Sequence, residues 1–210
     1  MIKLLVFDFD GTIADSKKLY IDAIFGFTKK YGYKLTKRHV ERSLGPKLDL
    51  SLHNAGIRRY AEKIGCEINK YLIKEAPKLK LCPYVKETLR RIKERRILKT
   101  VLLTNSTRPF INVFLKKNNL RNYFGKILGA EDFLVKEEAF EKLFRKFKIK
   151  PQETVYIADK TKDVDIARKV GCKIIIVLSC SWDRKKFKKR KMKKFYIINS
   201  MKDLINYLEK

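Results

Sequence analysis

Two carboxylates one residue apart stand directly after a short apolar run near the start of the chain. The run covers residues 2–7, and the segment Asp-Phe-Asp-Gly-Thr that follows contains Asp8, Asp10, Gly11 and Thr12. Because side chains alternate along an extended chain, both carboxylates point to the same side, where a nucleophile and a proton donor could flank one substrate. Gly11 permits a sharp turn out of the strand, and Thr12 supplies a hydroxyl and backbone donors near a bound phosphoryl group. The competing interpretation is a loop or capping carboxylate pair.

Further residues that suit the same chemistry recur at the ends of other apolar runs or ahead of a helix. They are Thr104 and Asn105 at the end of the run 100–104, Lys136 ahead of a helix at 139–147, and Asp159 and Asp163 after the run 154–158. A carboxylate that attacks a phosphate monoester brings anions together, so such a site needs a divalent cation and fixed positive groups. Plainer interpretations are a surface lysine for Lys136, a strand end for Thr104, and for Asp163 an acid that favours the first turn of a helix.

Hydrophobic patterning predicts the elements that position these residues. Nearly continuous apolar runs at 2–7, 100–104, 154–158 and 173–178 predict strands buried on both faces of a parallel sheet, with shorter candidates at 126–128 and 195–198. Helical periodicity fills the gaps between the runs. The alternation predicts an α/β fold with a doubly wound, mainly parallel sheet, in which the site lies beyond the carboxyl ends of the strands.

The pattern changes between residues 15 and 80, where no convincing strand is found. Apolar residues there recur on one helical face, at Tyr20, Ala23, Ile24, Phe27 and Tyr31. We therefore expect an inserted α-helical domain at 15–80, while residues 1–14 and 81–210 form the core.

These motifs, in this order, resemble the haloacid dehalogenase (HAD) superfamily of phosphatases, and in particular its phosphoglycolate phosphatase-like members with a small helical cap. The resemblance covers essentially the whole chain. It implies a Rossmann-like core, and a cap that closes over the site and selects the substrate. Three residues depart from the family's pattern: Ala158 where glycine is usual, Lys160 where a small polar residue is usual, and Glu137 where proline often follows the lysine.

The resemblance also implies a chemistry, that of a magnesium-dependent phosphatase with an aspartyl-phosphate intermediate on Asp8. Asp10 would protonate the departing alkoxide and then deprotonate the attacking water, while Lys136 would neutralise negative charge. Mg²⁺ would be held by the Asp8 carboxylate, the Asp10 backbone carbonyl, Asp159 and, directly or through water, Asp163. A carboxylate at position 10 favours a phosphatase or phosphomutase over dehalogenases, phosphonatases and ion-pumping ATPases.

Five residues are the expected substrate contacts. Thr104 would bind a phosphoryl oxygen, with Gly11 and Thr12 nearby, and Asn105 would support the pocket. Lys47, in the turn Gly45-Pro46-Lys47, lies where related caps face the substrate, although a plain helix-breaking turn is the competing interpretation. The expected substrate is a small phosphorylated metabolite, such as a phosphorylated hydroxy acid or sugar.

Composition sets wider bounds. The 210 residues are 45% hydrophobic, enough for one core with a small inserted domain, and the formal net charge is +28. Such a charge attracts anions of every size, from phosphate esters to nucleic acid, and a lysine-rich proteome is the plainer explanation. The four cysteines form no C-x-x-C pair and are expected to be reduced, and no apolar run reaches the length of a signal peptide or membrane span. We expect a cytoplasmic protein without a membrane partner.

One segment is strongly biased: nine of the eleven residues from Arg184 to Lys194 are Lys or Arg. We favour a solvated loop, with a surface that tracks a nucleic-acid backbone as the alternative. Nucleic acid is therefore a less favoured partner than a metabolite. Two competing functions follow, a nucleic-acid end phosphatase and a catalytically silent family member that binds nucleic acid through its basic surface.

Overall fold

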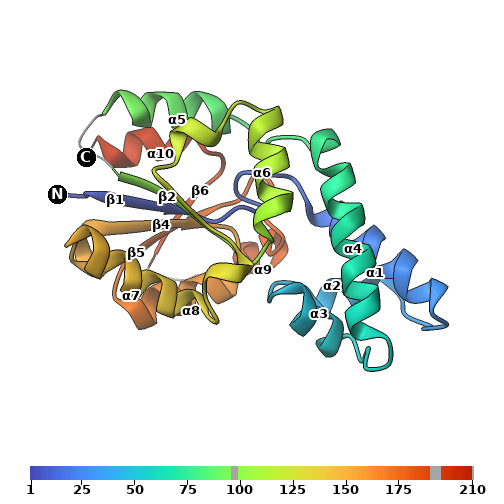
Figure 1. Ribbon diagram of the computed structural model, residues 1–210. Helices are drawn as coiled ribbons and strands as arrows, with labels where there is room; N and C mark the ends of the chain where they lie inside the picture. The colour runs from blue at the N-terminus through green and yellow to red at the C-terminus, as the bar shows by residue number, and fades with distance from the viewer. Residues whose placement is uncertain (96–98, 190–194, 210) are drawn as a thin grey trace.

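The computed structural model describes residues 1–95, 99–189 and 195–209, and within them the centre of the molecule is a six-stranded sheet (Figure 1). The strands are β1 (Leu4–Phe7), β2 (Lys99–Leu103), β3 (Lys126–Leu128), β4 (Thr154–Ala158), β5 (Lys173–Val177) and β6 (Tyr196–Ile198). Their order is β3-β2-β1-β4-β5-β6, and neighbours run parallel. The order progresses outward from β1 in both directions, so the predicted doubly wound sheet is confirmed.

Helices cover both faces of this sheet, which explains why the central strands β1, β2, β4 and β5 are nearly continuous apolar runs rather than alternating ones. Leu5 and Phe7 of β1 belong to the cluster that packs against α5 (Val85–Glu94), α6 (Arg108–Lys117) and α10 (Lys202–Leu208). Leu4 and Val6 belong to the opposite cluster, under α7 (Lys136–Phe147), α8 (Thr161–Val170) and α9 (Arg184–Lys189). Short 3₁₀ turns complete the connections, at η1 (Ala76–Lys78), η2 (Arg121–Tyr123), η3 (Ala130–Asp132) and η4 (Pro151–Glu153).

Four helices between β1 and α5 form the cap. They are α1 (Lys17–Lys30), α2 (Lys37–Ser43), α3 (Leu48–Asn54) and α4 (Ala61–Glu75), and Figure 1 shows them grouped beyond one end of the sheet. The segments that lead into and out of the cap are paired: the amide of Asp15 donates to the Lys80 carbonyl at 3.0 Å, and that of Cys82 donates to the Ile13 carbonyl at 2.9 Å. The expected helical cap is confirmed, and its division from the core at 14/15 and 80/81 stays a prediction.

The lysine-rich stretch differs from the expected loop. Its first six residues form α9, and the rest, residues 190–194, lie outside the described residues. The physical reason is Phe187, which is buried against the sheet and packs edge to face on Phe195 with ring centroids 5.9 Å apart. One apolar anchor therefore holds a helix whose first three side chains, those of residues 184–186, face solvent. Across the described ranges, no helix has the length and apolar character needed to cross a membrane.

Candidate active site

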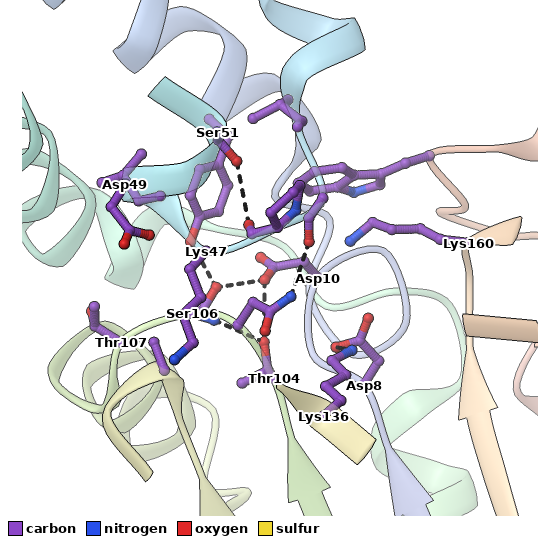
Figure 2. Close-up of a pocket in the computed structure, with 18 of the residues that line it drawn as sticks. Asp8, Asp10, Lys47, Asp49, Ser51, Thr104, Ser106, Thr107, Lys136 and Lys160 are labelled. Carbon is purple, nitrogen blue, oxygen red and sulfur yellow. Dashed lines mark hydrogen bonds and ion pairs between the residues drawn. The ribbon is translucent and has the colours of Figure 1, made fainter. Parts of the chain in front are cut away.

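A cavity of about 320 Å³ lies where the carboxyl ends of β1 and β2 meet the cap (Figure 2). Its walls come from the residues that follow β1 and β2, from the start of α7, and from the cap turn at 44–49. Six of the predicted site residues line it: Asp8, Asp10, Lys47, Thr104, Asn105 and Lys136. The parallel sheet explains the convergence, because the carboxyl ends of neighbouring strands meet at one edge.

Asp8 and Lys136 form a buried ion pair on the floor of the cavity. The Lys136 Nζ lies 3.1 Å from Asp8 Oδ1, and both side chains are at least 95% buried. Burial raises the pKa of Asp8, and the Lys136 ammonium opposes that shift. Burial alone would lower the pKa of Lys136, but Asp163 and Asp8 together outweigh it, so its pKa is raised. Lys136 is therefore a fixed positive charge beside the Asp8 carboxylate.

Three carboxylates form an acidic cluster beside this pair. One oxygen from each of Asp8, Asp159 and Asp163 lies within 4.8 Å of the other two. Asp159 Oδ2 accepts a hydrogen bond from the amide of Trp182 at 2.7 Å, whereas its buried Oδ1 has no hydrogen-bond partner among the described residues. Burial raises the pKa of Asp159 well above its usual range, although Lys160 opposes the shift. A cation can satisfy a buried carboxylate oxygen that has no hydrogen-bond donor, and clustered hard oxygen ligands suit Mg²⁺.

Tyr156, on β4, connects the lysine to the acidic cluster. Its hydroxyl donates to Asp163 Oδ1 at 2.8 Å and accepts from Lys136 Nζ at 2.6 Å. Lys136 itself lies 3.3 Å from the same Asp163 oxygen, and the amide of Lys160 donates to Asp163 Oδ2 at 3.2 Å. Three groups therefore fix the position of Asp163. An acid that served only to stabilise the first turn of a helix would not need these contacts.

Asp10 lies in a different environment, among hydroxyl groups. The Ser16 Oγ donates to its Oδ1 at 2.6 Å. The Ser106 Oγ donates to its Oδ2 at 2.5 Å, as Figure 2 shows. The Tyr20 hydroxyl in turn lies 2.7 Å from Ser106 Oγ. Hydroxyl groups can donate to a carboxylate and can accept from a carboxylic acid, so this environment serves Asp10 in both protonation states.

The predicted substrate contacts divide into two groups. Thr104 lines the cavity, and its Oγ1 accepts from the amide of Ser106 at 3.1 Å. Asn105 and Lys47 also line the cavity, but they join core and cap: Asn105 Nδ2 donates to the Gly45 carbonyl at 3.0 Å, and Lys47 Nζ donates to the Phe133 carbonyl. Lys47 therefore has a role in holding the cap against the core, whether or not it also contacts a substrate.

Gly11 and Thr12 are buried residues of the turn after β1 and are not part of the cavity's lining. Gly11 has a φ of +78°, and a Cβ there would stand 2.3 Å from Asp159 Oδ2, so only glycine fits between the turn and this carboxylate. The Thr12 Oγ1 is buried and has no hydrogen-bond partner within the described chain. Gly11 therefore acts on the acidic cluster, and a direct substrate contact for either residue stays a prediction.

Of the three residues that depart from the family's pattern, Lys160 is the one that changes the charge of the site. Its Nζ lies 3.9 Å from Asp159 Oδ1 and 4.0 Å from the centroid of the Trp182 ring. The side chain is only 13% exposed, and Figure 2 shows it extending toward Asp10 and Asp8 from the side opposite Lys47. Burial alone would lower the pKa of Lys160, but Asp159 and Asp8 outweigh it and the pKa is raised. The site thus contains a second internal cation beside a candidate metal ligand.

The other two departures are accommodated without visible strain. Ala158 is buried at the end of β4, and Glu137 pairs with Lys169 at 3.1 Å in the first turn of α7. Sequence reasoning missed Ser16, Tyr20, Ser106, Tyr156 and Trp182. The sequence hinted at only two of them. Ser106 belongs to the segment Thr-Asn-Ser after β2, and Tyr156 lies on β4, the strand that Asp159 follows. The other three reach the site through tertiary packing alone.

Comparison with known proteins identifies the family of this chain. The sequence profile of the haloacid dehalogenase-like hydrolase family matches residues 5–177, so the chain belongs to this family. It is 26% identical over 183 residues to a phosphoglycolate phosphatase of Synechococcus elongatus, covering 86% of this chain and 84% of that protein. It is also 25% identical over 220 residues to a pyrophosphatase of Bacillus mycoides, covering 100% and 98% respectively.

A solved structure shows the same fold. A haloacid dehalogenase-like family hydrolase from Streptococcus pneumoniae superposes with a TM-score of 0.81 at 18% identity, covering 99% of this chain and 98% of that one. The expected family, with a Rossmann-like core and a helical cap, is therefore confirmed, and the relatives found agree with the expected class of enzyme, a HAD-type phosphatase.

Proposed function

We propose that this protein is a magnesium-dependent phosphatase that hydrolyses a small phosphate monoester through an aspartyl phosphate on Asp8. The observation that supports the proposal most directly is the 3.1 Å contact between Asp8 and Lys136 at the edge of the cluster Asp8, Asp159 and Asp163. An anionic nucleophile approaches an anionic ester only where positive charge is already in place. Lys136 supplies part of that charge, and a bound Mg²⁺ would offset the remaining charge of the carboxylates and the phosphoryl oxygens.

Asp8 and Asp10 would divide the chemistry between them. A carboxylate oxygen of Asp8 forms a bond to phosphorus as the ester P–O bond breaks, and Asp10 gives its proton to the departing alkoxide. Asp10 then takes a proton from a water molecule that attacks the aspartyl phosphate, and phosphate leaves with Asp8 restored. The hydroxyls of Ser16 and Ser106 hold the Asp10 carboxyl in place through both steps.

The substrate class follows from the relatives and from the size of the cavity. Relatives named phosphoglycolate phosphatase and pyrophosphatase support a small phosphorylated compound, and about 320 Å³ is enough for a phosphoryl group with a short leaving group. The cap closes this space from above through the contacts of Asn105 and Lys47, which supports a role of both residues in selecting the leaving group.

The test is release of phosphate from para-nitrophenyl phosphate. We expect turnover that requires Mg²⁺, disappears with a chelator, and falls by at least about a thousandfold in Asp8→Asn. The matched control is Asp165→Asn, the same change at an exposed position on α8, which should keep wild-type turnover. Turnover that survives in Asp8→Asn would remove the proposed nucleophile.

The catalytically silent alternative is decided by the same assay. Lys160 motivates it, because an internal cation beside Asp159 could substitute for a metal ion. The complete set of carboxylates around Lys136 favours the enzyme. A folded protein that binds Mg²⁺ but releases no phosphate from any ester would favour the silent member.

A further inference from the structure

A second, larger cavity adjoins the candidate active site. Its volume is about 790 Å³, more than twice that of the inner cavity, and it lies between α2 of the cap and the first turns of α7 and α8 in the core. The two cavities share part of their lining, namely the cap turn 44–47, Asn105, Lys136, Lys160 and Trp182. We call the second cavity the outer groove. A leaving group bound at Asp8 can extend into it.

The outer groove has an excess of unpaired positive charge. Five acidic residues line it, and four of them form ion pairs: Glu41 with Lys17, Glu137 with Lys169, Asp163 with Lys136 and Asp183 with Lys186. The fifth, Asp49, is exposed and has no ion-pair partner among the described residues. Among the described residues, Arg38, Arg42 and Lys162 line the same groove, are exposed, and have no acidic partner. Arg38 and Arg42 are four residues apart on α2 and so lie on one side of that helix.

An apolar surface lies beside these cations. Leu134 is 83% exposed and Val135 is 56% exposed, directly ahead of Lys136, and Leu50 of the cap is 49% exposed across the groove. Large apolar side chains in this number around one concave site are typical of ligand binding. Two arginines next to an apolar surface match a ligand that has both a phosphate group and a flat uncharged body.

We propose that the outer groove binds the leaving group of a nucleoside phosphate that carries a second phosphate, with the second phosphate at Arg38 and Arg42 and the base against Leu134 and Val135. This inference rests on the proposed function and names its substrate class more narrowly. Two sources share the chemistry, a free nucleoside bisphosphate and the phosphorylated end of an oligonucleotide. A phosphoryl group on a two-carbon acid would leave the outer groove empty, so the groove distinguishes this chain's substrate from such compounds.

The experiment compares three substrates that differ only beyond the reacting phosphoryl group. They are adenosine 5′-monophosphate, adenosine 3′,5′-bisphosphate and a 5′-phosphorylated oligoadenylate. We expect the wild-type kcat/KM to be at least about tenfold higher with the second phosphate present, mainly through KM. In Arg38→Ala/Arg42→Ala this preference should fall to about twofold or less, with a smaller dependence on salt concentration.

The matched control removes the same charge elsewhere. Lys86→Ala/Arg90→Ala changes two exposed cations, also four residues apart, on α5, which Figure 1 shows far from the cap. This variant should keep the wild-type preference. A preference for the oligonucleotide over the bisphosphate would identify nucleic-acid ends as the source, and the reverse would identify the free nucleotide.

Binding to the Asp8→Asn variant, measured by calorimetry with Mg²⁺ present, separates this inference from the proposed function. If Asp8→Asn binds the bisphosphate more tightly than the monophosphate, and Arg38→Ala/Arg42→Ala in the same background abolishes the difference, the groove assignment holds even if no ester is turned over. Equal affinity for the two nucleotides, or a preference that survives the double substitution, overturns it. Hydrolysis of para-nitrophenyl phosphate tests the proposed function separately from this binding experiment.

Discussion

Lys160 is the residue at which this site differs most from its family's pattern. Its ammonium lies within 4 Å of both Asp159 Oδ1 and the centroid of the Trp182 ring, so its position is fixed by one charge and one aromatic face. In this place it offsets part of the negative charge of the acidic cluster. It also adds positive charge to both cavities, because it lines the two of them.

The first residue-level prediction concerns metal affinity. Replacing Lys160 with the smaller polar residue usual in the family, in Lys160→Ser, removes a positive charge next to Asp159. Two unit charges 4 Å apart interact by about 4 kcal/mol at an effective dielectric of about 20, and Mg²⁺ would be repelled by a part of this. We expect Mg²⁺ to bind about 3- to 30-fold more tightly to the variant, measured by isothermal titration calorimetry without substrate.

The control for this prediction is Lys169→Ser, which removes an exposed lysine from α8, the helix that Lys160 precedes. Its affinity for Mg²⁺ should match that of the wild type. Weaker Mg²⁺ binding in Lys160→Ser would mean that the lysine positions Asp159 for the metal, and the electrostatic argument would be wrong.

The residues that sequence reasoning found and those it missed differ in how they are placed. Asp8 and Thr104 were predictable because each follows a strand, and the ends of parallel strands converge. Ser16 and Trp182 were not, because one enters the site from the start of the first cap helix and the other from the loop after β5. Their hydrogen bonds to Asp10 and Asp159 depend on the packing of distant segments, which no local pattern in the chain reveals.

At the scale of elements, the turn between β1 and α1 is tightly constrained. Gly11 has a positive φ, and the position of its missing side chain is taken by Asp159 and by Cδ1 of the Trp182 ring, 2.8 Å from an ideal Cβ. The turn, the end of β4 and the loop after β5 therefore meet at one point. This packing aligns Asp8 with Asp159 in the acidic cluster.

The prediction at this scale is that Gly11→Ala damages both folding and metal binding. A residue with a side chain costs about 1–2 kcal/mol at positive φ, and the collision of its Cβ with Asp159 adds to that cost. We expect the free energy of unfolding in urea to fall by about 3 kcal/mol or more, and Mg²⁺ affinity to fall by at least about tenfold as Asp159 is displaced.

Gly32→Ala is the matched control, because Gly32 has a nearly equal φ of +82° but no heavy atom within 4 Å of an added Cβ. It should lose only the backbone contribution, about 1–2 kcal/mol, and bind Mg²⁺ as the wild type does. Equal losses of stability in the two variants, with metal affinity retained in both, would contradict the proposed role of the close contact at Gly11.

The elements themselves were largely predictable, and the exceptions have a physical cause. The central strands β1, β2, β4 and β5 are largely buried and leave nearly continuous apolar runs, whereas the edge strands β3 and β6 are short and partly exposed; all six were found to within about two residues. The start of the lysine-rich segment was predicted as a loop because its charge density opposes a helix when the segment is considered alone. Phe187 overrides that preference through a contact with Phe195, a residue eight positions further along the chain.

At the scale of the whole molecule, charge is the dominant feature. The chain has 51 Lys and Arg against 23 Asp and Glu, so most basic side chains have no acidic partner available anywhere. Repulsion among them destabilises the compact state, and dissolved salt screens this repulsion over a Debye length of about 10 Å at 0.1 M. A protein stabilised mainly by surface ion pairs would respond to salt in the opposite direction.

The final prediction is therefore a rise in thermal stability with salt. Increasing sodium chloride from about 50 to about 500 mM at pH 7 should raise Tm by about 2–6 °C, corresponding to about 1–2 kcal/mol for a chain of this size. The control is the same titration near pH 10, close to the sequence pI of about 10.0, where the net charge and hence the effect of salt should nearly vanish. A Tm that falls with salt at pH 7 would show that attraction within ion pairs, such as Lys30 with Glu67, outweighs the overall repulsion.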